Sequence, residues 1–387
     1  MYNFVFHVPT EVHFGKGTLK DLPEIANRYG KKAMLVYGGQ GIKTAPFWGE
    51  ILDLLKGAGV QYTEFSMEPN PKVDAINEGV ALARKNGVEM LIAVGGGSAI
   101  DTSKLIAACF HYDGDAWDIV SGKAKITAAL PIIAVSTVAA TGSDMDDDGV
   151  IGNPVTKEKI SCPHPLMRPS VSILDPTLTF SVPKRQTSLG TLDIMSHVFE
   201  QYFTHIRTAY IQDRFCESIL KTCIHYGPVA LAEPDNYEAR ANLQWCASLA
   251  LCGLIGCGKA EPWSVHVIES MFCARYNTTH GAVLSILTPV WMEMALNGDT
   301  ADKFAEYGVN VWGLDPDRPA MDNARAAIRM TREFFTKMGG PATFAEIGID
   351  DGQFRQIAAV CGEIPDLTEG FLPLDADGVL KLLTACK

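Results

Sequence analysis

The sequence predicts two domains of different class, an α/β Rossmann-like domain followed by an all-helical domain. In residues 1–182, short β-branched runs punctuated by glycine alternate with amphipathic helical segments, which is typical of a parallel sheet wrapped by helices. From Thr187 onward the hydrophobic periodicity is helical and alternating runs are few. The 387 residues suffice for about two or three domains. We therefore expect domains at 1–182 and 183–387, with the break near Val182.

The strands and helices of the first domain can be placed in order. An opening pair of strands is expected, and each later strand is followed by a helical segment. In a parallel sheet, ligands sit beyond the carboxyl ends of the strands, so the glycine turns there are candidate binding sites. The expected strands are Phe4–His7, Val12–Phe14, Ala33–Tyr37, Tyr62–Phe65, Met90–Val94 and the strand and turn Val171–Pro176. The expected helices are Leu19–Arg28, one after Pro46, Val73–Arg84 and Ala99–Ala108.

The second domain reads as a series of long helices. Glycine and proline mark where we expect these helices to break. The expected breaks are at Gly227-Pro228, Pro234-Asp235, Gly256–Gly258 and Gly339–Pro341.

Composition and charge exclude several classes of protein. The net charge of −12 argues against a nucleic-acid partner, because phosphates require a basic face. The longest apolar runs, such as Ala128–Val135, are far shorter than the roughly 18 residues of a membrane span. The start of the chain lacks the pattern of a secretory signal, so we expect a cytoplasmic protein. Its ten cysteines lie in apolar contexts and are interpreted as reduced core residues.

Two glycine turns are candidates for binding a dinucleotide. The first, Gly95-Gly96-Gly97-Ser98, joins an apolar strand to a helix, where backbone N–H groups can close on phosphates. A tight turn without a ligand is the alternative interpretation. The second turn, Gly38-Gly39-Gln40-Gly41, has no acidic residue to grip a ribose 2′-hydroxyl or repel a 2′-phosphate. With Lys43 nearby, this favours NADP over NAD.

Four other residues suit a divalent metal ion. Asp193 and His197 are four residues apart in a segment without helix breakers, so both project from one helix face. His266 and His280 follow later in the chain. Three imidazoles and one carboxylate suit Fe²⁺ or Zn²⁺ and leave positions open for a substrate. Spacing alone does not bring the two pairs together, and a surface or core polar pair is the alternative.

Taken jointly, these motifs resemble the iron-containing (group III) alcohol dehydrogenases, and most closely their NADPH-dependent butanol dehydrogenase and aldehyde reductase branch. The resemblance spans essentially the whole chain. The motifs that carry it are Pro9-Thr10 with Phe14-Gly15-Lys16-Gly17, Gly95 to Asp101, Thr137 with Thr141-Gly142-Ser143, Leu174-Asp175-Pro176, Asp193 with His197, and His266 with His280.

The resemblance implies a fold, a reaction and a set of site residues. The fold is the dehydroquinate synthase-like fold of that family, and the reaction interconverts primary alcohols and aldehydes with NADPH. A homodimer is expected, with no nucleic-acid or membrane partner. The implied metal ligands are Asp193, His197, His266 and His280, and the implied catalytic residues are His266 and Ser270. The expected cofactor-binding residues are Gly38, Gly39, Gln40, Gly96, Gly97, Ser98, Asp101, Thr137, Thr141, Ser143 and Lys159.

Two departures from the family pattern concern the reaction. Ser270 replaces the histidine that the family usually has four residues after the first of the paired histidines, and serine cannot hold a proton as an imidazolium does. Asp146-Asp147-Asp148 adds negative charge where the family has small or amide residues. We expect Asp147 and Asp148 to face solvent, because uncompensated carboxylates are rarely buried.

Two other functions compete with the aldehyde reductase. Related families oxidise polyols or act on sugar phosphates, and Lys259 and Arg275 flank the histidine segment as candidates for a substrate phosphate. The other alternative is a relative that binds NADP but has lost turnover. For the aldehyde reductase, Trp263 and Phe272 beside His266 predict an apolar substrate pocket.

Overall fold

The computed structural model describes all residues, 1–387, and the chain divides into two compact units. The sheet unit comprises His7–Pro183 and Glu233–Cys252, and the helical unit comprises Met1–Phe6, Lys184–Ala232 and Gly253–Lys387. The main division thus falls between Pro183 and Lys184, beside the break expected near Val182. Two segments differ from the expected domains, since Met1–Phe6 belongs to the helical unit and Glu233–Cys252 belongs to the sheet unit. For the second segment, helical periodicity does not tell which neighbour a helix packs against.

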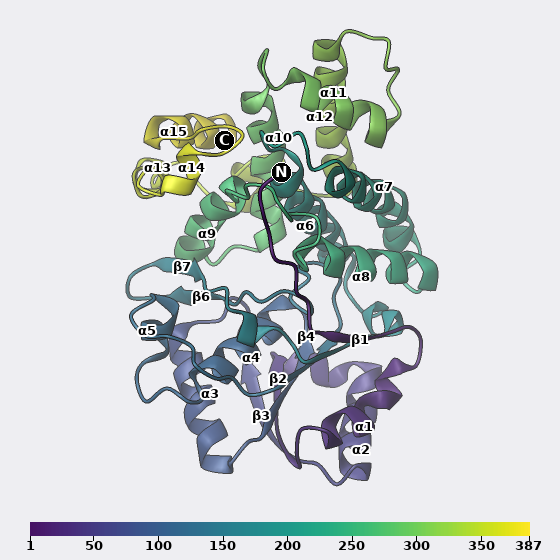
Figure 1. Cartoon of the computed structure of the whole chain (residues 1–387), viewed down its shortest axis with the longest axis vertical. Coiled ribbons are helices and arrows are strands. Elements are labelled where there is room, and N and C mark those ends of the chain that lie inside the picture. The colour runs from purple at the N-terminus through teal and green to yellow at the C-terminus, as the bar shows by residue number, and fades with distance from the viewer. The chain divides into compact units, whose positions relative to one another are not determined.

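The sheet unit is built on a six-stranded parallel sheet with the order β1-β8-β5-β4-β2-β3. Helices α1 and α2 cover one face of this sheet, and α3 and α4 cover the other (Figure 1). The central strands are buried on both faces, which explains their continuous apolar sequences. The strands are β1 Glu11–Phe14, β2 Lys32–Gly38, β3 Gln61–Met67, β4 Met90–Gly95, β5 Ile132–Ser136 and β8 Val171–Leu174.

The remaining elements of the sheet unit are helices and one hairpin. Strands β6 Val150–Asn153 and β7 Glu158–Ser161 pair antiparallel outside the main sheet. The helices are α1 Leu22–Asn27, α2 Pro46–Gly57, α3 Val73–Asn86, α4 Gly97–Cys109, α5 Ala116–Val120 and α8 Tyr237–Leu251, with 3-10 turns at Thr18–Asp21, Gln40–Thr44, Pro165–Met167 and Pro176–Thr179.

The beginning of the chain differs from the sequence prediction. Residues 4–7 form no strand, and β1 pairs in parallel with β8 rather than with a preceding strand. The apolar run at Phe4–Phe6 therefore indicated exposed side chains and not a buried strand. The hairpin β6–β7 was not anticipated, because each of its strands has only four residues.

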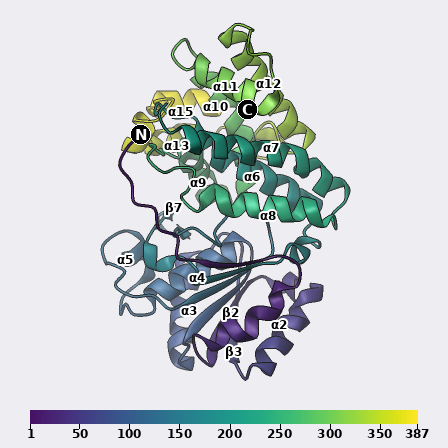
Figure 2. The ribbon, with the colours of Figure 1, turned by 45° about the vertical axis from the view of Figure 1, so that its right-hand side comes forward.

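The helical unit contains no strand. Among its helices, α11 and α12 lie side by side (Figure 2). The helices are α6 Lys184–Tyr202, α7 Tyr210–Ala232, α9 Ser264–Tyr276, α10 His280–Ala295, α11 Ala301–Trp312, α12 Ala320–Lys337, α13 Phe354–Cys361, α14 Pro365–Thr368 and α15 Ala376–Ala385, with a 3-10 turn at Ala345–Ile347. No helix of the chain has the length and hydrophobicity that crossing a membrane requires.

The break expected at Gly227-Pro228 is wrong, because α7 continues through both residues. Proline removes one main-chain donor from a helix and crowds the residue before it. Here that residue is glycine, which has no Cβ to clash. A Cβ at Gly227 would also lie 2.9 Å from Thr191, so the glycine permits α7 to approach α6 closely.

The ten cysteines are all free thiols, and eight of them are buried. Burial raises the pKa of Cys109, Cys216, Cys361 and Cys386 to about 12, which keeps these thiols protonated. This agrees with their interpretation as reduced core residues.

A buried lysine holds the aspartate-rich segment of the sheet unit. Lys104 on α4 is completely buried and pairs with Asp146, while it also donates hydrogen bonds to Ser143 Oγ at 2.9 Å and to the Asp148 carbonyl at 2.8 Å. Burial is the main cause that raises the pKa of Asp146 to about 7. Lys104 opposes this shift, while the negative charges of Asp101 and Asp148 add to it. One cation therefore compensates several buried carboxylates.

The solvent-facing placement expected for Asp147 and Asp148 is wrong. Asp147 lies 3.3 Å from the guanidinium of Arg168, and Asp148 accepts hydrogen bonds from Ser161 Oγ at 2.5 Å and from the Cys162 amide at 2.8 Å. Both carboxylates are half-buried and paired. The sequence pattern around these aspartates does not reveal their partners, because the partners lie 13 to 21 residues further along the chain.

Replacing Lys104 tests the importance of this compensation. Lys104→Met keeps the side-chain length but leaves the neighbouring carboxylates buried without their cation, so we expect the free energy of unfolding to fall by about 3–5 kcal/mol. Urea denaturation measures this change. The exposed Lys125 provides a control, because Lys125→Met should change stability by no more than about 0.5 kcal/mol. Equal stability of the two variants would contradict the role of Lys104.

Candidate functional site

Three helices of the helical unit bring the four candidate metal ligands together. Asp193 and His197 lie one turn apart on α6, His266 lies in the first turn of α9, and His280 is the first residue of α10. One ligand atom from each residue lies within 4.8 Å of the other three. The structure thus joins the two pairs that sequence spacing could not connect.

Burial and charge make this cluster suitable for a cation. Asp193 and His197 are almost completely buried, and Asp193 Oδ1 lies 3.3 Å from His280 Nε2 and 3.7 Å from His197 Nε2. Burial lowers the pKa of His197 to about 3, so this imidazole stays neutral and can donate its lone pair. Burial opposes ionisation of Asp193, but His197 and His280 hold the pKa of its carboxyl below the usual range.

The four clustered side chains have the chemistry and spacing that a metal ion requires. His266 Nε2 is buried and has no hydrogen-bond partner within the protein, which is unusual for a buried polar atom. Ligand bonds of about 2.0–2.2 Å place ligand atoms roughly 3–4 Å apart, so small side-chain adjustments suffice to bring all four onto one ion. Three imidazole nitrogens and one carboxylate oxygen are donors that Fe²⁺ and Zn²⁺ both accept.

Two buried carboxylates that the sequence interpretation missed lie behind the histidines. Glu200 Oε1 lies 3.1 Å from His266 Nδ1, and Glu269 Oε2 lies 2.6 Å from His280 Nδ1. Helical spacing carried a signal for both, because Glu200 follows His197 by three residues and Glu269 follows His266 by three. Carboxylates in this position commonly orient metal-binding histidines.

Ser270 and Trp263 border the cluster on the same helix. Ser270 follows His266 by one helical turn, is partly exposed, and its hydroxyl has no hydrogen-bond partner within the protein. The Trp263 ring stands edge-on to His266, with ring centroids 5.4 Å apart. Its backbone has φ 51°, a left-handed conformation that is strained for a bulky residue and is often retained at functional sites.

Three residues expected near the substrate have other partners. Phe272 is completely buried and stacks on Phe344, so it lines the core and not a substrate pocket. Lys259 Nζ is buried and lies 2.6 Å from Asp213, which leaves it unable to meet a substrate phosphate. Arg275 donates a hydrogen bond to the Met271 carbonyl. The sequence could not reveal these contacts, because Phe344 and Asp213 are distant along the chain.

In the sheet unit, the turn after β4 has the close packing that its glycines indicated. Gly95 has φ 153°, and a Cβ on Gly97 would lie 2.5 Å from Thr141 Oγ1. Ser98 lies in the first turn of α4, where backbone amides lack helical partners. The Thr137 amide donates to the Gly95 carbonyl. Strand β4 lies between β5 and β2, so this turn is flanked by Thr137 and by Gly38.

Asp101 and Ser143, both expected to bind the cofactor, bind each other. Ser143 Oγ donates to Asp101 Oδ1 at 2.6 Å and accepts from Lys104, and burial raises the pKa of Asp101. Their side chains therefore fasten α4 to the loop that carries Thr141. Lys159 lies on β7, paired in register with Gly152 of β6.

The second glycine turn follows β2, as the sequence predicted. Gly39 has φ 63°, and its amide donates to the Met67 carbonyl at the end of β3. Gln40 begins the next 3-10 turn and is exposed. Lys43 is paired with Glu64 on β3, which also accepts a hydrogen bond from Tyr37 at 2.8 Å. The positive charge that favoured a 2′-phosphate thus already has a carboxylate partner.

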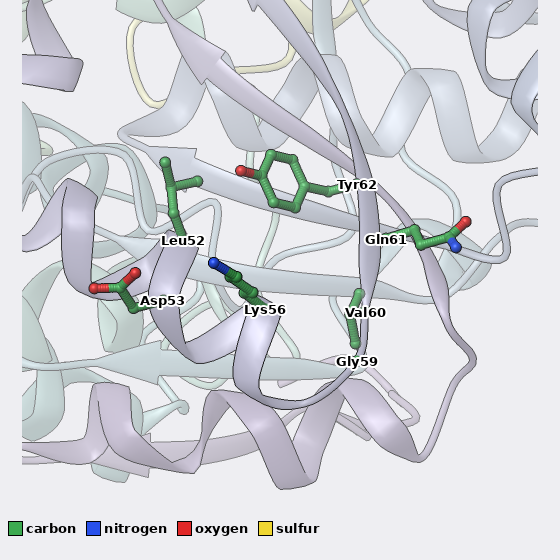
Figure 3. Close-up of a pocket in the computed structure, with 7 residues that line it drawn as sticks. All are labelled: Leu52, Asp53, Lys56, Gly59, Val60, Gln61 and Tyr62. Atoms are coloured by element: carbon green, nitrogen blue, oxygen red, sulfur yellow. The ribbon is translucent and has the colours of Figure 1, made fainter.

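A surface hollow of about 500 Å³ lies away from these residues. Figure 3 shows its lining, which comes from the end of α2 and the beginning of β3. Gln61 and Tyr62 lie at the amino end of β3, whereas the glycine turns follow the carboxyl ends of their strands. The hollow therefore belongs to the opposite edge of the sheet from the candidate cofactor residues. The lining residues are Leu52, Asp53, Lys56, Gly59, Val60, Gln61 and Tyr62.

Family comparison covers both parts of the chain. The profile of iron-containing alcohol dehydrogenases matches residues 9–176, and that of the C-terminal part of the Fe-containing alcohol dehydrogenase family matches residues 187–386. The chain belongs to the iron-containing alcohol dehydrogenase family. The match to the second profile contains all four candidate metal ligands.

Relatives within this family are similar over nearly the full length. The chain is 46% identical to NADH-dependent butanol dehydrogenase A of Clostridium acetobutylicum, covering 99% of both chains. It is 38% identical to the NADPH-dependent aldehyde reductase YqhD of Escherichia coli, covering 90% of both. The crystal structure of NADH-dependent butanol dehydrogenase A from Thermotoga maritima superposes with a TM-score of 0.93 at 34% identity, covering 100% of this chain and 99% of that one.

Proposed function

We propose that this protein is a metal-dependent NAD(P)H oxidoreductase that interconverts primary alcohols and aldehydes, working mainly as an aldehyde reductase. The observation that carries the proposal is the cluster of Asp193, His197, His266 and His280, whose ligand atoms lie within 4.8 Å of one another. Membership of the iron-containing alcohol dehydrogenase family supports it independently. The donor set suits Fe²⁺ or Zn²⁺.

The two units have different tasks in this proposal. The helical unit holds the metal ion, and the sheet unit holds the dinucleotide through the turns after β2 and β4. A bound divalent ion supplies Lewis acidity toward the substrate oxygen, and a reduced nicotinamide supplies the hydride. The chain itself supplies backbone amides at Gly97 and Ser98 for the pyrophosphate, which the first turn of α4 leaves without helical partners.

Ser270 and Trp263 are the proposed substrate-side residues. The Ser270 hydroxyl can pass a proton to and from water, since it is partly exposed and has no partner within the protein. It cannot store the proton as a histidine would. The edge-on ring of Trp263 beside His266 gives the site one apolar wall, which favours a hydrocarbon tail over a polyol.

A homodimer is also proposed, with β1 as the contact. This strand lies at one edge of the sheet, where its unpaired side presents free backbone N–H and C=O groups.

Removing one ligand tests the metal-dependent reaction. His266→Ala deletes a nitrogen donor from the cluster, so we expect kcat/KM for butanal to fall by at least about 100-fold. The assay follows NADH or NADPH oxidation in protein purified without chelator. The control is His225→Ala, because His225 is exposed on α7 outside the cluster. Undiminished activity of His266→Ala would contradict a metal-dependent reaction.

For the cofactor, we propose that both NADPH and NADH are accepted. The glycine turn at Gly38–Gly41 has no acidic residue to repel a 2′-phosphate, which admits NADPH. The pairing of Lys43 with Glu64 limits the preference for it, because the lysine charge is already compensated.

Breaking this pair tests the cofactor proposal. Glu64→Gln removes the carboxylate and frees the Lys43 charge, so we expect the ratio of kcat/KM with NADPH to that with NADH to rise about 5- to 10-fold. Steady-state kinetics with both cofactors measure the ratio. Adding Lys43→Met to Glu64→Gln should cancel the gain. A ratio that is the same in all three proteins would show that the pair lies outside the reach of the 2′-phosphate.

A further inference from the structure

We propose that Glu200 is a positioning residue, which orients the His266 ring so that its Nε2 faces the other metal ligands. Glu269 performs the same task for His280. This inference rests on the proposed metal-dependent function and extends it from the ligands to the buried carboxylates behind them.

Glu200 contacts His266 through its backbone and its side chain together. Its Oε1 accepts hydrogen bonds from the Val265 amide at 2.7 Å and the His266 amide at 3.1 Å, and it lies 3.1 Å from His266 Nδ1. The residue is only 4% exposed. Because Glu200 lies on α6, the helix that supplies Asp193 and His197 also fixes the third ligand.

This contact determines which nitrogen of His266 is free. An ionised carboxylate only accepts hydrogen bonds, so Nδ1 must carry the proton that it shares with Glu200. The lone pair of the neutral ring is then on Nε2, the atom that is buried without a partner. His266 is thereby held in the form that binds a metal ion.

Glu269 extends the arrangement to the next helix. It is completely buried, and its Oε2 lies 2.6 Å from His280 Nδ1, while His280 Nε2 faces Asp193. Thus a carboxylate on α6 orients a ligand on α9, and a carboxylate on α9 orients a ligand on α10.

His197 differs from His266 and His280 because no carboxylate lies beside its Nδ1. Its Nδ1 has no partner, and its ring instead stacks on His266 with centroids 4.6 Å apart and an interplanar angle of 21°. The plane of His197 therefore depends on the plane of His266. A change at Glu200 should disturb two of the four ligands.

The simpler alternative is that Glu200 only caps the first turn of α9. Capping would affect the stability of the helix but not the choice of nitrogen on His266. Glu200→Gln tests the charge alone, because its amide oxygen can still accept from both backbone N–H groups and from His266 Nδ1 but lacks the negative charge that makes the imidazole a stronger metal ligand. Glu200→Ala removes both roles.

The test measures metal affinity directly in the full-length protein after removal of metal with a chelator. Zn²⁺ is titrated in competition with a fluorescent chelator, and Co²⁺ absorption reports the ligand geometry. We expect Glu200→Ala to weaken Zn²⁺ binding by about 10- to 100-fold. Glu200→Gln and Glu269→Gln should also weaken Zn²⁺ binding, but by less than Glu200→Ala. Altered Co²⁺ spectra in the glutamine variants would support a positioning role.

Glu217→Gln and Glu217→Ala provide the matched controls. Glu217 is also a buried carboxylate of the helical unit, but it accepts hydrogen bonds from Tyr202 at 2.8 Å and Asn310 at 2.9 Å and has no contact with a ligand. We expect its variants to bind Zn²⁺ within about twofold of the unchanged protein.

Two results would overturn the inference. Zn²⁺ affinity and Co²⁺ spectra unchanged in Glu200→Gln and Glu269→Gln would assign these residues to stability alone, even if Glu200→Ala does not fold. Equal losses in the Glu217 and Glu200 variants would have the same meaning. Absence of Zn²⁺ binding by the unchanged protein would instead contradict the proposed function itself.

Discussion

The burial of the Asp193 carboxylate among three imidazoles is the interaction on which the account of the helical unit depends. A buried carboxylate is costly unless a positive charge compensates it. In the absence of a metal ion, burial disfavours protonation of His280, but Glu269 and Asp193 raise the pKa of this imidazole to about 10. Helices α6, α9 and α10 supply these four residues.

The sheet unit also contains buried charges that are compensated, and these lie beside the candidate cofactor turn after β4. Lys104 neutralises part of the charge of the aspartate segment, and Ser143 links that segment to Asp101. These contacts hold the loop of Thr141 against Gly97, where the glycine permits an approach that a Cβ would prevent. In both units, the residues nearest the proposed ligands are supported by buried polar groups behind them. Such support fixes side chains and loops without the ligand being present.

The sequence was informative wherever a local pattern was sufficient. Hydrophobic runs ending in glycine located β2 and β4, and the spacing of Asp193 and His197 located one face of α6. Contacts between distant segments were beyond such patterns. Tertiary packing determines the partners of Lys259 and Phe272 and the pairing of Lys43 with Glu64. It also determines the partners of the half-buried Asp147 and Asp148. The exposed run at Phe4–Phe6 was misread because apolar sequence does not distinguish a buried strand from an exposed segment.

The metal content of the purified protein shows whether the cluster of Asp193, His197, His266 and His280 binds a metal ion. The full-length chain, prepared without oxygen or chelators, is dialysed and analysed by mass spectrometry for all first-row transition metals, alongside an Asp193→Ala, His197→Ala double variant. We expect about one Fe²⁺ or Zn²⁺ per chain in the unchanged protein and almost none in the variant. Equal metal content in the two proteins, or a metal-free unchanged protein that still reduces aldehydes, would contradict this expectation.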